Sequence, residues 1–159
     1  MNTYIIIGIV IVATALAMFL RSIRGDRPAT LAQLPDIVAQ LQSTGSDESF
    51  AVFLLTPPGD RENPDTAVNL QYSIANGRLG LDWELLAPRN IADAEKFAAF
   101  ARAQGHTVSD LKPNKTRVLR VEDGDLVGLG RGVATQLYGL APDAAVTLIA
   151  EGFEWRPPT

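Results

Sequence analysis

The sequence contains no cysteine and only one histidine, His106. Without a thiol, the chain cannot form disulfides, zinc–thiolate sites, iron–sulfur clusters or a cysteine nucleophile. A single imidazole also excludes any metal site built on a pair of histidines. Apolar residues make up 47% of the chain and charged residues 20%, which excludes a disordered chain. A length of 159 residues then predicts one folded domain, with room for an appendage.

Residues 4–20 contain no charge, and they predict a transmembrane helix. As a helix they would span about 26 Å, slightly less than the roughly 30 Å of a bilayer core. The stems of the following arginines can extend the span by snorkelling. The predicted anchor residues are Tyr4, Ile5, Ile6, Ile7, Leu16, Phe19, Leu20, Arg21 and Arg24. A cleaved signal peptide is the alternative, but the basic residues follow the apolar stretch instead of preceding it.

Basic residues on one side of this stretch predict its orientation. Arg21, Arg24 and Arg27 follow it, whereas only the α-amino group precedes it. The positive-inside rule therefore predicts a single-pass cell-membrane protein with its N-terminus outside and the rest of the chain in the cytoplasm. The alternative is that the domain lies on the outer side. We divide the chain into an anchor with its basic juxtamembrane segment, 1–27, and a soluble domain, 28–159.

The soluble domain is acidic. Residues 28–159 carry 11 basic and 17 acidic side chains, a net charge of −6. A nucleic-acid partner would require a basic stripe, so we expect none. The predicted partners are the membrane, through the N-terminal helix, and a protein.

Helix and strand patterns alternate along the domain. Apolar residues at helical spacing predict a helix over 28–41, where Pro35 should kink the helix or restart it. Further helices are expected from Asn90 to Gly105 and from Leu126 to Gly139, where glycine follows each apolar stripe. The predicted strands are 50–55, the two arms of a hairpin around 76–77, 117–122 and 146–153. This order predicts an α+β fold, in which a two-layer sandwich pairs a mainly antiparallel sheet with about three helices.

Asn76-Gly77 predicts a type I′ turn, and this turn sets the register of its hairpin. With Ala75 opposite Arg78, one face carries only apolar residues and is expected in the core. Its pairs are Ile74–Leu79, Tyr72–Leu81, Leu70–Trp83 and Val68–Leu85. The pairs Ser73–Gly80, Gln71–Asp82 and Asn69–Glu84 form the other face, which we expect to face water.

Two segments invite a chemical interpretation. Glu122-Asp123-Gly124-Asp125 could hold Mg²⁺ or Ca²⁺ through its carboxylates, although no EF-hand spacing follows. The other interpretation is a tight turn in which Asp123 or Asp125 caps the next helix. Gly128-Leu-Gly130-Arg-Gly132 departs from a dinucleotide fingerprint, because Val133 stands where the third glycine belongs. These glycines are expected to let a helix pack closely on the sheet.

His106 is expected to cap a helix end, because it directly follows Gly105 and no Gly-x-Ser-x-Gly nucleophile accompanies it. Asp82 and Glu84 share one face of a strand and are expected to be solvated. No complete catalytic constellation and no cofactor site is predicted. The sequence therefore favours a membrane-tethered, non-enzymatic interaction module, and the alternative is a metal-assisted enzyme using Glu122, Asp123 and Asp125. The candidate partner surface is the polar sheet face with Asn69, Gln71, Ser73, Asp82 and Glu84.

Overall fold

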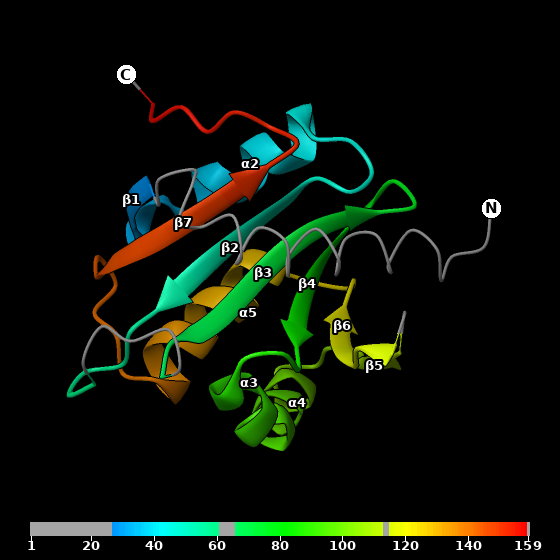
Figure 1. Ribbon diagram of the computed structural model, residues 1–159, viewed down its shortest axis with the longest axis vertical. Helices are drawn as coiled ribbons and strands as arrows, with labels where there is room; N and C mark the ends of the chain where they lie inside the picture. Colours follow the sequence, from blue (N-terminus) through cyan, green and yellow to red (C-terminus); the bar gives the residue numbers. More distant parts are fainter. Residues whose placement is uncertain (1–26, 61–65, 113–114, 159) are drawn as a thin grey trace.

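A computed structural model describes residues 27–60, 66–112 and 115–158, which form an antiparallel sheet of seven strands with helices against it (Figure 1). The strands are β1 (Arg27–Thr30), β2 (Phe50–Leu55), β3 (Val68–Ala75), β4 (Arg78–Glu84), β5 (Ser109–Leu111), β6 (Val118–Val121) and β7 (Ala145–Glu151). The helices are α2 (Leu34–Thr44), α3 (Pro88–Ala92), α4 (Ala94–Ala103) and α5 (Leu126–Gly132). A 3-10 turn, η1 (Leu31–Gln33), precedes α2, and a π-helical turn, η3 (Val133–Leu137), follows α5. The strand order is β1-β7-β2-β3-β4-β6-β5, so the predicted α+β class is confirmed.

The predicted anchor, residues 4–20 with Arg21 and Arg24, lies outside the described residues. Within the three described ranges, no helix combines the length and the apolar character needed to cross a bilayer. The transmembrane helix therefore stays a prediction.

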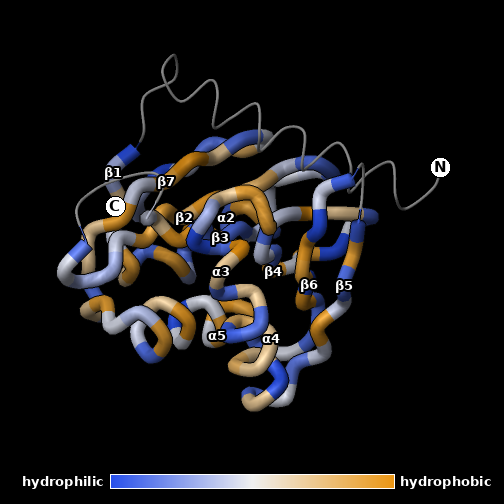
Figure 2. Tube along the Cα trace, turned by 60° about the horizontal axis from the view of Figure 1, so that its bottom comes forward, coloured by the Kyte–Doolittle hydropathy of each residue, from blue (hydrophilic) through white to orange (hydrophobic). Residues whose placement is uncertain are grey.

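One face of the sheet packs against α2, α4 and α5 and forms the main core. In Figure 1, α5 passes behind the central strands and α2 lies behind β7, and Figure 2 shows α4 and α5 together on one side of the sheet. Each helix contributes one apolar stripe, as its spacing predicts. The buried stripe residues are Leu34, Ile37, Val38 and Leu41 on α2, Phe97, Ala98 and Ala101 on α4, and Leu126 and Leu129 on α5.

The central hairpin has the predicted register. Ala75 pairs with Arg78, and Tyr72 pairs with Leu81. Asn76 and Gly77 have φ angles of 53° and 70°, the positive values that a type I′ turn requires at both positions. Because the side-chain period along a strand is two, this register carries the large apolar side chains of β3 and β4 into the helix-covered core.

Trp83 occupies the centre of the core contact between β4 and α4. Its ring stacks on Phe97, with 4.6 Å between ring centroids and 7° between planes. Its indole N–H donates to the backbone carbonyl of Asn90 at 2.9 Å, so the polar atom of this fully buried side chain is satisfied. Trp83 therefore positions both α3 and α4.

Two helical segments differ from the prediction. Residues 28–30 belong to β1, and α2 begins only at Leu34 with Pro35 in its first turn. This is the restart that Pro35 suggests, since proline fits the first turn of a helix and not its interior. The predicted helix from Asn90 is divided at Asp93 into α3 and α4, which raises the number of described α-helices to four.

The two outer strands are absent from the prediction. β1 pairs only with β7, and β5 pairs only with β6. With four and three residues, both strands are too short to show the side-chain period of two that marks a strand. Pro28 also argues against a strand in its segment, because proline is disfavoured within strands. β1 pairs with residues at least 115 positions away along the chain, and β5 with residues at least 7 positions away, and local patterning does not predict either pairing.

Replacing Trp83 with alanine should strongly destabilise the full chain. Loss of the stacked ring and its cavity should cost about 3–5 kcal/mol. Ile91→Ala, at an exposed position on α3, should change the free energy of unfolding by less than about 0.5 kcal/mol. Urea unfolding in mild detergent, followed by circular dichroism, measures both. Equal losses in the two variants would contradict this description of the core.

Candidate functional site

The polar face of the sheet does not face water as predicted. Its residues are nearly inaccessible, with relative exposures from 0 to 6%, and they are Asn69, Gln71, Ser73, Asp82 and Glu84. The register that groups them is right, but the expectation that they are solvated is wrong. Alternation along a strand shows which side chains share a face, whereas it does not show whether a polar side chain bonds to water or to another side chain.

Arg120 on β6 is the centre of a buried polar network on this face. Its guanidinium donates to both carboxylate oxygens of Asp82, at 2.7 and 2.9 Å, and to the Ser73 hydroxyl at 2.8 Å. The Ser73 hydroxyl in turn donates to Asp82. Beside this group, the Gln71 amide donates to Glu84 at 3.0 Å. Charged groups buried together stabilise a fold only when they are paired and hydrogen-bonded in this way.

Gly80 makes the network possible. It lies on β4 between Arg120 on β6 and Ser73 on β3, and a Cβ atom at this position would overlap the guanidinium of Arg120. The absence of a side chain therefore opens a path for Arg120 across the middle strand. The sequence places Gly80 opposite Ser73, but nothing in the local pattern identifies Arg120 as the partner.

The acidic turn that follows β6 does not gather its carboxylates around one point. Glu122 accepts from Arg120 at 2.7 Å and lies 3.1 Å from Arg78. Asp123 accepts from the backbone N–H of Thr107 at 3.0 and 3.1 Å, and Asp125 accepts from Gly128 N–H at 2.8 Å. Within the described ranges, no group of three acidic or histidine side chains could hold a metal ion.

These contacts support the capping interpretation of the turn. Asp125 is the N-cap of α5, which satisfies one of the free N–H groups at the start of that helix. The hydrogen bonds from the Thr107 backbone lower the pKa of Asp123 below its ordinary value, because they favour the charged carboxylate. Each carboxylate of the turn is thus held by a different part of the protein.

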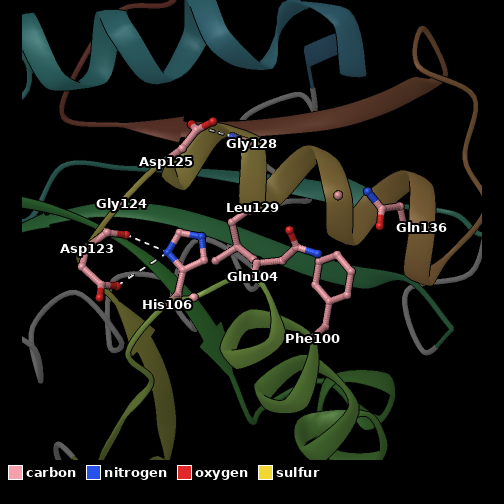
Figure 3. Close-up of a pocket in the computed structure, with 11 residues that line it drawn as sticks. Phe100, Gln104, His106, Asp123, Gly124, Asp125, Gly128, Leu129 and Gln136 are labelled. Atoms are coloured by element: carbon pink, nitrogen blue, oxygen red, sulfur yellow. Dashed lines mark hydrogen bonds and ion pairs between the residues drawn. The ribbon is translucent and has the colours of Figure 1, made fainter.

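A pocket of about 330 Å³ lies beside this turn, between the end of α4 and the outer side of α5 (Figure 3). His106 forms one wall, and its side chain is only 8% exposed. The His106 Nδ1 atom lies 2.8 Å from the backbone carbonyl oxygen of Asp123 and 3.6 Å from its carboxylate. The pocket is lined by Phe100, Gln104, Gly105, His106, Asp123, Gly124, Asp125, Gly128, Leu129, Gly132 and Gln136.

A second hollow of about 490 Å³ lies on the other side of the turn, between α2 and the β3–β4 hairpin. Gln42, Arg78 and Glu122 are among its lining residues. Both hollows include Gly124 and Asp125, so the turn forms the ridge between them. We refer to the turn at 122–125 with its two flanking hollows as the turn surface.

The glycines of α5 set how deeply this helix sits. A Cβ atom at Gly130 would overlap the Tyr72 hydroxyl, which donates to the Leu126 carbonyl at 2.9 Å. Burial, with a smaller contribution from Asp125, raises the pKa of Tyr72, so this hydroxyl stays a donor. Close packing of the helix on the sheet is the interpretation expected from the sequence, and these contacts agree with it.

The sequence predicts that the His106 ring caps α4. Its backbone N–H does bond to the Ala101 carbonyl in the last turn of that helix, but the ring bonds instead to Asp123, 17 residues further along the chain. Spacing along the chain could not indicate this contact, because it depends on how β6 and α4 meet. Among the described residues lining the pocket, no serine, threonine or lysine accompanies the imidazole as a nucleophile.

No family model, no curated protein and no solved structure matches this chain. The function is therefore inferred from the geometry of the turn surface and the pocket.

Two arginines near β6 provide a matched test of the buried network. Arg120→Ala should destabilise the full chain by about 3–5 kcal/mol, because it leaves the Asp82 carboxylate buried without its partner. Arg117 also pairs with an aspartate, Asp110, but both side chains are about half exposed. Arg117→Ala should leave the unfolding curve nearly unchanged, because solvent screens an exposed pair. Urea unfolding in mild detergent compares them, and similar curves for both variants would contradict the network's role.

Proposed function

We propose that this protein is a membrane-tethered interaction module, without an enzymatic activity of its own, that binds a protein partner through the turn surface. Residues 4–20 anchor it as a single span, and the arginines that follow hold the remaining chain on the cytoplasmic side. The polar sheet face, the first candidate for this contact, is replaced because its side chains are buried.

The proposal rests on two features found together. The surface is already hollow, and the carboxylates on it already have hydrogen-bond partners within this chain. Hollows of about 330 and 490 Å³ flank the turn, and both open on the surface. The carboxylates between them are fixed by Thr107, Arg120 and the start of α5. Rigid polar groups beside a concave surface lower the ordering cost of binding, which suits recognition. Separate engagement of each carboxylate opposes shared coordination of a metal ion.

Electrostatics favour a basic partner. Residues 28–159 have a net charge of −6, and the exposed part of the turn surface presents the carboxylates of Asp123 and Asp125. Surface charge of one sign speeds the approach of a partner of the opposite sign and disfavours wrong partners. The same charge keeps the domain away from an anionic leaflet, whereas the juxtamembrane arginines favour that leaflet.

Topology can be tested with single cysteines, because the natural chain has none. An impermeant maleimide applied to intact cells should label Thr3→Cys and should not label Ser46→Cys. Ser46 is exposed at the end of α2, so permeabilised cells should show labelling of both variants. Labelling of Ser46→Cys alone in intact cells would contradict the cytoplasmic placement, and recovery of the chain without membranes would contradict the anchor.

Site-specific photocrosslinking in cells tests the partner surface. A photoreactive residue at Gln42 or at Gln136 lies in one or the other hollow and should form a discrete protein adduct. The same residue at Asp143, which is exposed but lines neither hollow, should form none. Equal adducts at all three positions, or none at the first two, would contradict the proposal.

A further inference from the structure

The orientation of His106 determines which of its nitrogens can meet a ligand. Nδ1 lies 2.8 Å from a backbone carbonyl oxygen, and a carbonyl oxygen can only accept. Nδ1 therefore carries the proton, and Nε2 of the neutral ring presents a lone pair. In Figure 3 this second nitrogen lies on the side of the ring away from Asp123. It has no hydrogen-bond partner among the residues that the structure describes, although the side chain is 92% buried, the complement of its 8% exposure.

The other polar groups of the pocket also favour a ligand that donates hydrogen bonds. Asp123 and Asp125 contribute carboxylates, and Gln104 and Gln136 contribute amide oxygens. No lysine or arginine is among the described residues that line it. An anion would therefore meet negative charge without compensation, whereas a cation would meet acceptors from several directions.

The walls of the pocket are closely packed. Gly128 and Gly132 lie one helical turn apart on α5, and the Asp125 carboxylate lies against Gly128. The Phe100 ring packs against Gly132, where an added Cβ atom would lie 3.1 Å from it. Figure 3 shows the Gln104 side chain between Phe100 and His106. Packing therefore holds the polar atoms of the pocket in place before a ligand arrives.

We propose that this pocket binds the guanidinium group of an arginine, which donates to His106 Nε2 and to the Asp125 carboxylate. A guanidinium has five N–H donors in one plane, whereas the ammonium of lysine is a compact point charge. The source of the arginine is a protein partner, and this part of the inference rests on the proposed function. The pocket itself can be tested without that partner.

His106 is the only histidine, so its imidazole signals in a selectively labelled chain need no assignment. We would titrate the full chain in detergent micelles with N-acetyl-arginine amide at about pH 8, where a free imidazole is neutral. The probe should shift the His106 nitrogen signals saturably, from a starting spectrum of the Nδ1–H tautomer. N-acetyl-citrulline amide, a neutral analogue of similar shape, should leave the signals in place, and N-acetyl-lysine amide should bind more weakly.

A matched pair of variants tests whether the Asp125 carboxylate contributes to arginine binding. Asp125→Asn should weaken arginine binding about tenfold, because a charge-assisted hydrogen bond becomes a neutral one. Asparagine is also a good N-cap, so α5 should remain folded. Asp36→Asn, in the first turn of α2 and outside the pocket, should leave the binding unchanged.

These experiments test the arginine pocket and the proposed function independently. No shift with the arginine probe, or equal shifts with citrulline or lysine, would overturn the guanidinium assignment even if crosslinked adducts form at Gln42 and Gln136. Saturable arginine binding that Asp125→Asn weakens would establish the pocket even if no adduct forms, and in that case the protein partner would be the part that is wrong.

Discussion

The ion pair between Arg120 and Asp82 holds together the part of the structure on which the turn surface depends. It joins β6 to β4 and, through Ser73, to β3, so one guanidinium links three neighbouring strands. Burying these charges is costly, and the cost is offset only while each is paired and hydrogen-bonded. Such a network tolerates one arrangement of its strands. It therefore specifies where β6 ends and where the acidic turn begins.

The acidic turn at 122–125 connects this buried network to the pocket. Glu122 is held by Arg120, Asp123 by the backbone of Thr107, and Asp125 by the first turn of α5. The same turn supplies the carbonyl that orients His106. The pocket walls thus come from α4, the turn and α5. Hydrogen bonds from the turn reach the residues that follow α4 and the first turn of α5. This preorganisation is what a binding site requires, because few groups remain to be ordered when a ligand arrives.

In the proposed arrangement, the two ends of the molecule have complementary electrostatic roles. Arginines next to the span favour the anionic leaflet, whereas the net charge of −6 over residues 28–159 disfavours close contact with it. The domain then presents its acidic turn to partners that approach along the membrane surface. A guanidinium pocket beside that turn would convert a general attraction between charges into recognition of one side chain.

Local patterns in the sequence were sufficient for the hairpin and for the helix stripes. Asn76-Gly77 and the strict alternation around it determine the β3–β4 register, because both the turn geometry and the period of two act between near neighbours. Pro35 marks the restart of α2, and Asp125 caps α5, for equally local reasons. The α+β class follows from the order of these elements alone.

Only the tertiary structure decided which polar groups meet. Arg120 reaches Ser73 across Gly80, and His106 meets Asp123, through pairings between segments distant along the chain. The short strands β1 and β5 form for the same reason, because a neighbouring strand supplies the hydrogen bonds that their own residues do not predict. Periodicity assigns each side chain to a face, but the free energy of a polar side chain on that face depends on its partner. Folding brings that partner within reach.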